Sequence, residues 1–101
     1  TLETSVFRLN LAVGFSVSQL KEAEEKRNPS LYPGLFFVSQ NVLAGGVRLY
    51  KVLNSDEKGV YIKAIYPDPD TPALSPRYTT KKELATFIEA YRCGVRAMQD
   101  M

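Results

Sequence analysis

The stretch 47–66 constrains the fold of this chain more than any other. Its two arms, VRLYKVLN and VYIKAIY, are rich in Val, Ile and Tyr, the residue types that favour strands. The polar segment 55–59 between them ends in Gly59 and contains the residue types that form tight turns. The sequence therefore predicts an antiparallel β-hairpin against which the remaining elements pack.

Length and composition indicate one globular domain. The chain has 101 residues, a usual size for a single domain. An apolar share of 45% is too high for a disordered chain, and a charged share of 24% is too high for a membrane protein. No segment reaches the roughly 18 consecutive apolar residues that a membrane-spanning helix needs. The single cysteine, Cys93, excludes an internal disulfide and favours a reducing compartment, so we expect a cytoplasmic protein.

The N-terminal part is predicted to form a strand followed by a helix. In residues 5–15 apolar side chains alternate with other residues at period two, which is typical of a half-buried strand. Ser16 and Gln19 have the spacing of a capping box, which predicts a helix beginning after Ser16. Asn28 and Pro29 should end that helix.

The middle of the chain is predicted to add one strand before the hairpin and a loop after it. Residues 35–43 form the strand, and Gly45 and Gly46 favour a tight turn from it into the hairpin. Residues 67–76 contain four prolines, which excludes a central strand and indicates an extended loop.

The last segment has the periodicity of one long helix. Thr80 and Glu83 have capping-box spacing. Six large apolar residues then recur at helical spacing: Leu84, Phe87, Ile88, Tyr91, Val95 and Met98. The predicted order is therefore β-α-β-β-β-α. This is an α+β fold in which an antiparallel meander sheet is covered on one face by a long C-terminal helix.

Several kinds of chemistry are excluded by composition. The chain has no histidine, which removes the commonest general acid–base group and the usual partner of a catalytic serine or cysteine. One cysteine cannot build a zinc site, and no glycine-rich phosphate-binding motif is present. Asp68 and Asp70 lie among prolines and are interpreted as turn residues. We therefore expect no catalytic site, no metal and no cofactor.

The simplest alternation assigns the hairpin residues to two faces. The core-facing set is Val47, Leu49, Leu53, Val60, Ile62 and Ala64. The outward-facing set is Arg48, Tyr50, Val52, Tyr61, Lys63 and Ile65. Lys51 falls on the inner face, where it must snorkel, pair or lie at the sheet edge. Asp56 and Glu57 are interpreted as a solvated turn.

The charge pattern suggests a local site. The net charge is only +2, so electrostatic recognition must depend on local groups. Lysines and arginines interleaved with tyrosines on a sheet are typical of surfaces that hold single-stranded nucleic acid. The candidate nucleic-acid-binding residues are Arg48, Tyr50, Tyr61, Lys63, Arg77, Lys81 and Lys82. The alternative is that these lysines are merely solvated, or neutralised by Asp68 or Asp70.

A second candidate surface lies on the predicted last helix. Five residues, four of them small or weakly polar and one a cysteine, recur at helical spacing: Thr86, Ala90, Cys93, Gly94 and Ala97. Such a stripe lets another helix or strand approach closely. One interpretation is a subunit or partner interface, including a homodimer, and the other is packing of the first helix.

Two functional hypotheses follow, both for a non-enzymatic protein. The first is a small module that binds nucleic acid through a basic and aromatic sheet face. The second is a protein-interaction module, such as an inhibitor, adaptor or assembly subunit.

Overall fold

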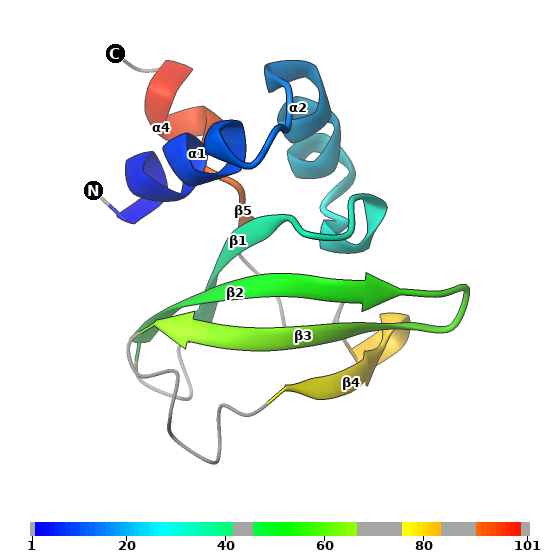
Figure 1. Ribbon diagram of the computed structural model, residues 1–101. Helices are drawn as coiled ribbons and strands as arrows, with labels where there is room; N and C mark the ends of the chain where they lie inside the picture. The colour runs from blue at the N-terminus through cyan, green and yellow to red at the C-terminus, as the bar shows by residue number, and fades with distance from the viewer. Residues whose placement is uncertain (1, 42–45, 67–75, 84–90, 100–101) are drawn as a thin grey trace.

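The computed structural model describes residues 2–41, 46–66, 76–83 and 91–99. The helices are α1 (Leu2–Ala12), α2 (Val17–Lys26), the short 3-10 helix η1 (Pro29–Leu31) and α4 (Val95–Gln99). The strands are β1 (Phe36–Asn41), β2 (Gly46–Ser55), β3 (Gly59–Tyr66), β4 (Arg77–Thr80) and β5 (Tyr91–Arg92) (Figure 1). The predicted α+β class is confirmed. The predicted element order is wrong at both ends of the chain.

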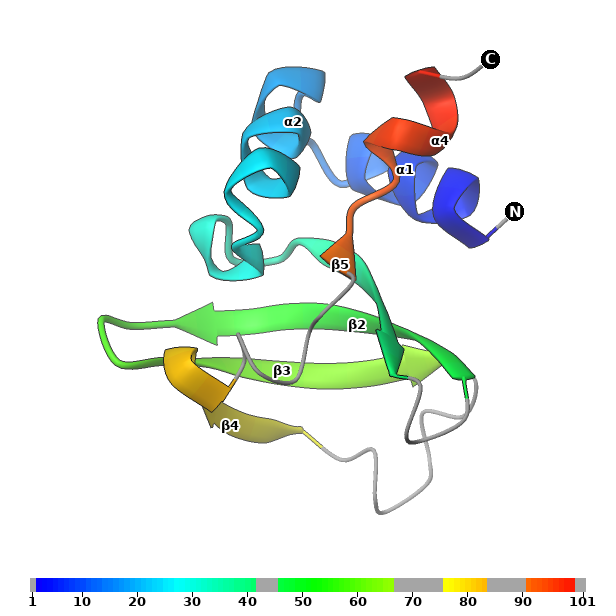
Figure 2. The same cartoon turned by 180° about the vertical axis from the view of Figure 1, so that it is seen from behind.

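The strands form one antiparallel sheet in the order β4-β3-β2-β1-β5. The consecutive strands β1, β2 and β3 are the predicted meander, and β2 and β3 are the predicted hairpin. The predicted turns at 44–47 and 67–76 fall largely outside the described residues. Helices α1, α2 and α4 gather beside β1 and β5 in both views, so β3 and β4 lie at the far side of the molecule (Figures 1 and 2).

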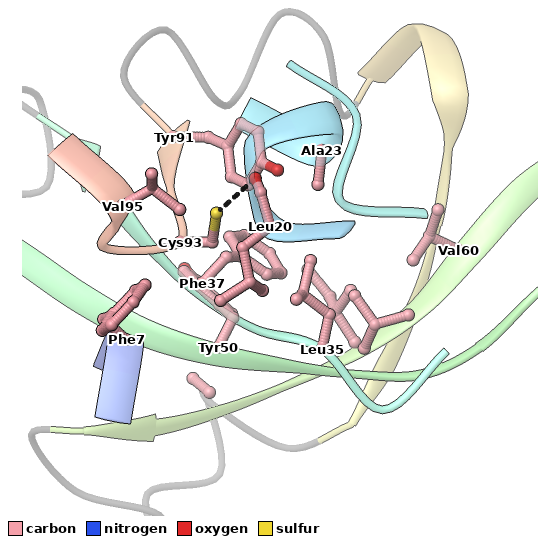
Figure 3. Close-up of a cluster of buried hydrophobic side chains, with 13 residues drawn as sticks. Phe7, Leu20, Ala23, Leu35, Phe37, Tyr50, Val60, Tyr91, Cys93 and Val95 are labelled. Atoms are coloured by element: carbon pink, nitrogen blue, oxygen red, sulfur yellow. Dashed lines mark hydrogen bonds between the residues drawn. The ribbon is translucent and has the colours of Figure 1, made fainter. Parts of the chain in front are cut away.

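The main core is built from side chains that converge from the sheet and from all three α-helices (Figure 3). The ring of Phe37 stacks on that of Tyr50 with centroids 5.4 Å apart, and meets Tyr91 edge-on at 5.6 Å. The Cys93 thiol donates a hydrogen bond of 3.0 Å to the carbonyl of Leu20. These contacts join β1, β2, β5 and α2 into one unit.

The N-terminal segment is a helix, so the prediction of a strand at 5–15 is wrong. Val6, Phe7 and Asn10 are its buried residues, and they lie on one side of a helix. The alternating apolar residues Leu9 and Leu11 are left more than a third exposed. Asn10 is polar but occupies a core position, so the sequence lacks the apolar spacing that is typical of a helix.

Asn10 attaches this helix to the sheet. Its side-chain amide accepts from the Phe36 N–H and donates to the Phe36 carbonyl, both at 2.9 Å. It also donates to the Cys93 carbonyl at 3.4 Å. The side chain therefore pairs with β1 as a neighbouring strand would, at a point where β5 does not reach. Because buried backbone groups need partners, the placement of Asn10 stabilises α1 against the sheet.

The long C-terminal helix is not present in the described residues. Thr80 Oγ1 does accept from the Glu83 N–H at 3.2 Å, so a helical turn begins where the capping box predicts. Tyr91 and Arg92 then pair with Ser39 and Val38 as strand β5. Gly94 follows with a φ of 92°, and only then does the five-residue α4 begin. Strand pairing and a left-handed glycine therefore interrupt the apolar periodicity.

Helix α2 agrees with its prediction. The Ser16 hydroxyl accepts from the Gln19 N–H at 3.2 Å, and the Gln19 side chain accepts from the Ser16 N–H at 2.8 Å. This reciprocal pair is the predicted capping box. The helix ends at Arg27 in the left-handed conformation, just before Asn28. In the part of the chain that is described, no helix has the length and hydropathy needed to cross a bilayer.

Candidate functional site

The hairpin faces are reversed on β2 relative to the prediction. Tyr50 and Val52 are 3% and 0% exposed, so they face the core, whereas β3 buries Val60, Ile62 and Ala64 as predicted. The pairing of β2 with β1 places Tyr50 opposite Phe37, which draws that face of β2 inward. A bulge between Val52 and Asn54 leaves Leu53 as an extra, exposed residue.

This reversal brings two lysines together on the opposite face. Lys51 of β2 and Lys63 of β3 are direct partners in the sheet register and are both half-buried. The Lys51 ammonium lies 5.4 Å from the centroid of the Phe36 ring. Within the described residues, neither lysine has a carboxylate at ion-pair distance. Like charges directly opposite each other destabilise a sheet, so this pair concentrates positive charge at a cost to folding.

The same face carries two exposed tyrosines beside the lysines. Tyr61 lies two residues from Lys63 on β3, and its direct partner on β4 is Tyr78. The two side chains are 39% and 49% exposed. We call this surface the open face, and its residues are Lys51, Asn54, Tyr61, Lys63 and Tyr78.

The hairpin turn holds Tyr78 in place. A Cβ atom added at Gly59 would lie 2.5 Å from the Tyr78 Cζ and Oη atoms, so the tyrosine ring packs directly against the backbone of Gly59. The Tyr78 hydroxyl donates to Asp56 Oδ1 at 3.2 Å. The N–H groups of Lys58 and Gly59 each donate to that oxygen at 2.8 Å. These contacts fix both the ring and the carboxylate before any ligand arrives.

The charge state of the turn follows from the same contacts. The N–H of Gly59, then that of Lys58, lowers the pKa of Asp56 below its usual value, and the charge of Lys81 adds to this. Asp56 is therefore ionised at neutral pH. Partial desolvation and the bond to Asp56 raise the pKa of Tyr78, so its hydroxyl remains a donor.

A cavity of about 300 Å³ lies at the turn end of the open face. It is lined by Asn54, Ser55, Asp56, Gly59, Tyr61 and Tyr78. This volume is at the lower end of the range for small-molecule pockets, so it suits one planar ring system and not a large ligand.

Exposed lysines border this end of the sheet. The Lys81 N–H donates to the Lys58 carbonyl at 3.1 Å, which brings the start of the helical turn at 81–83 beside the hairpin turn. Lys58, Lys81 and Lys82 are all exposed. The cavity thus lies between this group and the Lys51–Lys63 pair.

The structure brings some of the predicted nucleic-acid-binding residues together and separates others from them. Tyr61 and Lys63 lie on the open face, Lys81 and Lys82 lie at its turn end, and the backbone of Arg77 pairs with Ile62 in β4. Tyr50 is stacked in the core, so the expectation that it faces outward is wrong. Arg48 is half-buried and lies on the same side of β2 as Tyr50.

The sequence interpretation missed Tyr78, Asp56 and the outward position of Lys51. Tyr78 lies in a Tyr-Thr-Thr run whose β-propensity signals a strand. The position of Lys51 follows only from the pairing of β2 with β1. No pattern in the sequence places Asp56 against Tyr78, because the two residues are far apart in the chain.

The predicted small-residue stripe does not lie on one helix. Thr86 and Ala90 fall outside the described residues. Cys93 and Gly94 are buried between β5 and α4, and Ala97 is half-buried in α4. The basis for a continuous helical interface is therefore wrong, although Gly94 does allow a close approach, to α1.

Cys93 has the properties of a packing residue. Its N–H donates to the Glu24 carboxylate at 3.1 Å, and its side chain is 0% exposed. Burial, with a smaller contribution from Glu24, raises the pKa of the thiol to about 12. The thiol is therefore neutral at physiological pH, unlike a reactive cysteine. Among the described residues, no three or more acidic or cysteine side chains gather as metal ligands would.

The open face thus combines aromatic rings, positive charge and one fixed carboxylate beside a small cavity. Comparisons of this chain with protein families, curated proteins and solved structures found no match.

Proposed function

We propose that this chain is a non-enzymatic module that binds single-stranded nucleic acid through its open face. The observation that supports this most directly is the presence of two exposed tyrosines and two facing, half-buried lysines on one face of the sheet. Bases stack on tyrosine rings whatever their sequence, and lysines neutralise the backbone phosphates. Tyr61 and Tyr78 have the first role, and Lys51 and Lys63 have the second.

The lysine pair favours an anionic ligand. The two side chains are opposite each other in the register, and repulsion between them weakens the folded state. A phosphate bound between them removes that repulsion. The free energy that the repulsion costs the folded state is then recovered in part on binding, which increases the affinity. Tyr61 and Lys63 are about 7 Å apart along β3, since a strand rises about 3.3 Å per residue. One nucleotide can therefore stack on the ring while its phosphate contacts the lysine.

The first test removes the two facing charges. For Lys51→Gln/Lys63→Gln we expect affinity for a short single-stranded oligonucleotide to fall at least about tenfold at low salt. The slope of log affinity against log salt should fall by about 1.4, because each lost phosphate contact contributes about 0.7 for single strands. The free energy of unfolding should stay equal or rise by about 0.5 kcal/mol as repulsion is lost. Fluorescence anisotropy and chemical denaturation measure these quantities.

The matched control is Arg8→Gln/Lys21→Gln, which removes the same net charge from exposed positions on α1 and α2. Its affinity should stay close to that of the wild type. Equal losses in both double variants would mean that only overall charge matters. Absence of binding by the wild type at low salt would overturn the proposed function.

A second candidate, self-association, is favoured by the exposed apolar residues around the α1–α2 junction. Leu9, Leu11, Val13 and Val17 are 36–53% exposed within nine residues of chain. Exposed apolar side chains are typical of interaction surfaces where they form a contiguous patch.

For this candidate we expect the wild type to show a concentration-dependent mass in sedimentation velocity, and Val13→Lys/Val17→Lys to remain a monomer. Leu53→Lys, at an exposed apolar position on the hairpin bulge, is the matched control and should associate like the wild type. A wild type that stays monomeric at high concentration would remove this candidate.

A further inference from the structure

The cavity at the turn end of the open face has one polar wall and one aromatic wall. Tyr61 and Tyr78 are the aromatic residues of its lining, and Asn54, Ser55 and Asp56 are the polar ones. A ligand that fills about 300 Å³ here must be planar enough to lie along a ring and polar enough to meet a carboxylate. A nucleobase meets both requirements, and the open face is the proposed site for a single strand.

The carboxylate of Asp56 is held in one orientation. Its Oδ1 atom accepts from two backbone N–H groups and from the Tyr78 hydroxyl. Its Oδ2 atom takes no part in these three bonds, and it carries its own acceptor sites. Asn54 Oδ1 accepts from the Ser55 N–H at 2.8 Å and keeps a second lone pair. The Asp56 carboxylate therefore presents acceptors only, and its negative charge attracts hydrogen-bond donors.

The four bases differ in what they offer to such a wall. Guanine has two adjacent donors on its Watson–Crick edge, N1–H and N2–H₂. Adenine and cytosine each place an acceptor beside their amino group, and uracil and thymine flank their single N–H with two carbonyls. A carboxylate attracts the guanine edge and repels the acceptors of the others.

We propose that this cavity is a guanine-binding subsite of the open face, in which Asp56 accepts from the guanine edge and Tyr61 or Tyr78 stacks on the ring. The inference rests on the proposed function, because it specifies the base that a bound single strand places there. Lys58 and Lys81 beside the turn offset the repulsion between Asp56 and the phosphates of the strand.

The test compares oligothymidylates that carry one central dG, dA or dC, measured against the full chain by fluorescence anisotropy. We expect the wild type to bind the dG oligonucleotide about tenfold or more tightly than the dA one, since a two-bond base contact discriminates by roughly this factor. Titration with guanosine 5′-monophosphate should shift the NMR signals of the Gly59 and Tyr61 amides more than adenosine 5′-monophosphate does. This wild-type measurement needs no variant.

The sharpest variant is Asp56→Asn. An asparagine keeps the oxygen that accepts from the Lys58 and Gly59 N–H groups, so the turn is retained, and it replaces Oδ2 with a donor. The preference for dG should disappear, while binding of the oligonucleotide with dA is kept or improved. Glu57→Gln, which removes an exposed charge from the same turn, should keep the preference.

The outcomes separate this inference from the proposed function. Equal wild-type affinity for all three oligonucleotides, together with a loss in Lys51→Gln/Lys63→Gln, overturns the guanine subsite and leaves single-strand binding intact. A dG preference that survives in a folded Asp56→Asn variant also overturns the subsite. No binding to any oligonucleotide overturns the proposed function itself.

Discussion

Replacing Gly94 by alanine is expected to remove about 4 kcal/mol or more of folding stability, which places it among the most damaging single substitutions. A Cβ atom there would collide with the carbonyl oxygen of Glu3 and lie 2.8 Å from backbone and Cβ atoms of Phe7. These are atoms of α1 that cannot rotate away, so α1 and α4 must separate. The φ of 92° adds strain for any residue with a side chain.

The measurement for this variant is thermal unfolding. A small domain loses about 4–8 °C in Tm for each kcal/mol, so Gly94→Ala should lower the Tm by about 20 °C or prevent folding. Gly14→Ala is the matched control, because Gly14 has a φ of 108° with no other atom within 4 Å of an added Cβ. It carries the backbone strain without the collision. A similar Tm for the two variants would show that the close approach of α1 and α4 does not contribute to stability.

Replacing Asn10 by aspartate is expected to make stability strongly dependent on pH. When protonated, the introduced carboxyl can still donate to the Phe36 carbonyl and accept from the Phe36 N–H, as the amide does. When ionised, it is a buried charge that faces the carbonyl oxygens of Phe36 and Cys93. We expect a loss of about 3 kcal/mol or more at pH 7, the usual cost of an uncompensated buried charge.

The direction of the pH dependence follows from linkage. Burial at a fully enclosed position raises the folded-state pKa of the introduced carboxyl above its unfolded-state value of about 4. The unfolded state therefore releases its proton first. Relative to the wild type, the free energy of unfolding falls as pH rises from about 4 to the folded-state pKa. Below about pH 4 the free energy of unfolding of the variant should be close to that of the wild type.

Chemical denaturation at several pH values checks this expectation. Asn54→Asp is the matched control, because Asn54 is exposed and an aspartate there can still accept from the Ser55 N–H. Its stability relative to the wild type should vary little with pH. If the Asn10→Asp variant also showed no pH dependence, the amide of Asn10 would not be enclosed against β1.

The candidate site was only partly predictable from sequence. Tyr61, Lys63, Lys81 and Lys82 were recognised because aromatic and basic residues interleave in and after the hairpin. Tyr50 shares that pattern but is buried against Phe37, since the register with β1 decides which face of β2 is covered.

Other site residues depend on contacts between distant parts of the chain. Asp56 resembles an ordinary turn residue in sequence. It becomes part of a cavity only because β4 brings Tyr78 beside the hairpin turn.

By itself, the sequence determined the local elements whose signals agree with one another. The hairpin has β-branched arms and a turn at Asp56, and α2 has a complete capping box at Ser16 and Gln19. In both, short-range hydrogen bonds and propensity favour the structure that the full chain adopts. Such elements can be recognised without knowledge of their neighbours.

Only the tertiary structure decided the two ends of the chain and the faces of β2. The period-two pattern at 5–15 became a helix because Asn10 pairs with β1, and the helical pattern after Thr80 was interrupted because Tyr91 and Arg92 pair with the same strand. In each case hydrogen bonds to a distant strand, together with burial, outweighed a local preference of a few tenths of a kcal/mol per residue. The open face exists because that same strand, β1, draws Tyr50 inward and leaves Lys51 opposite Lys63.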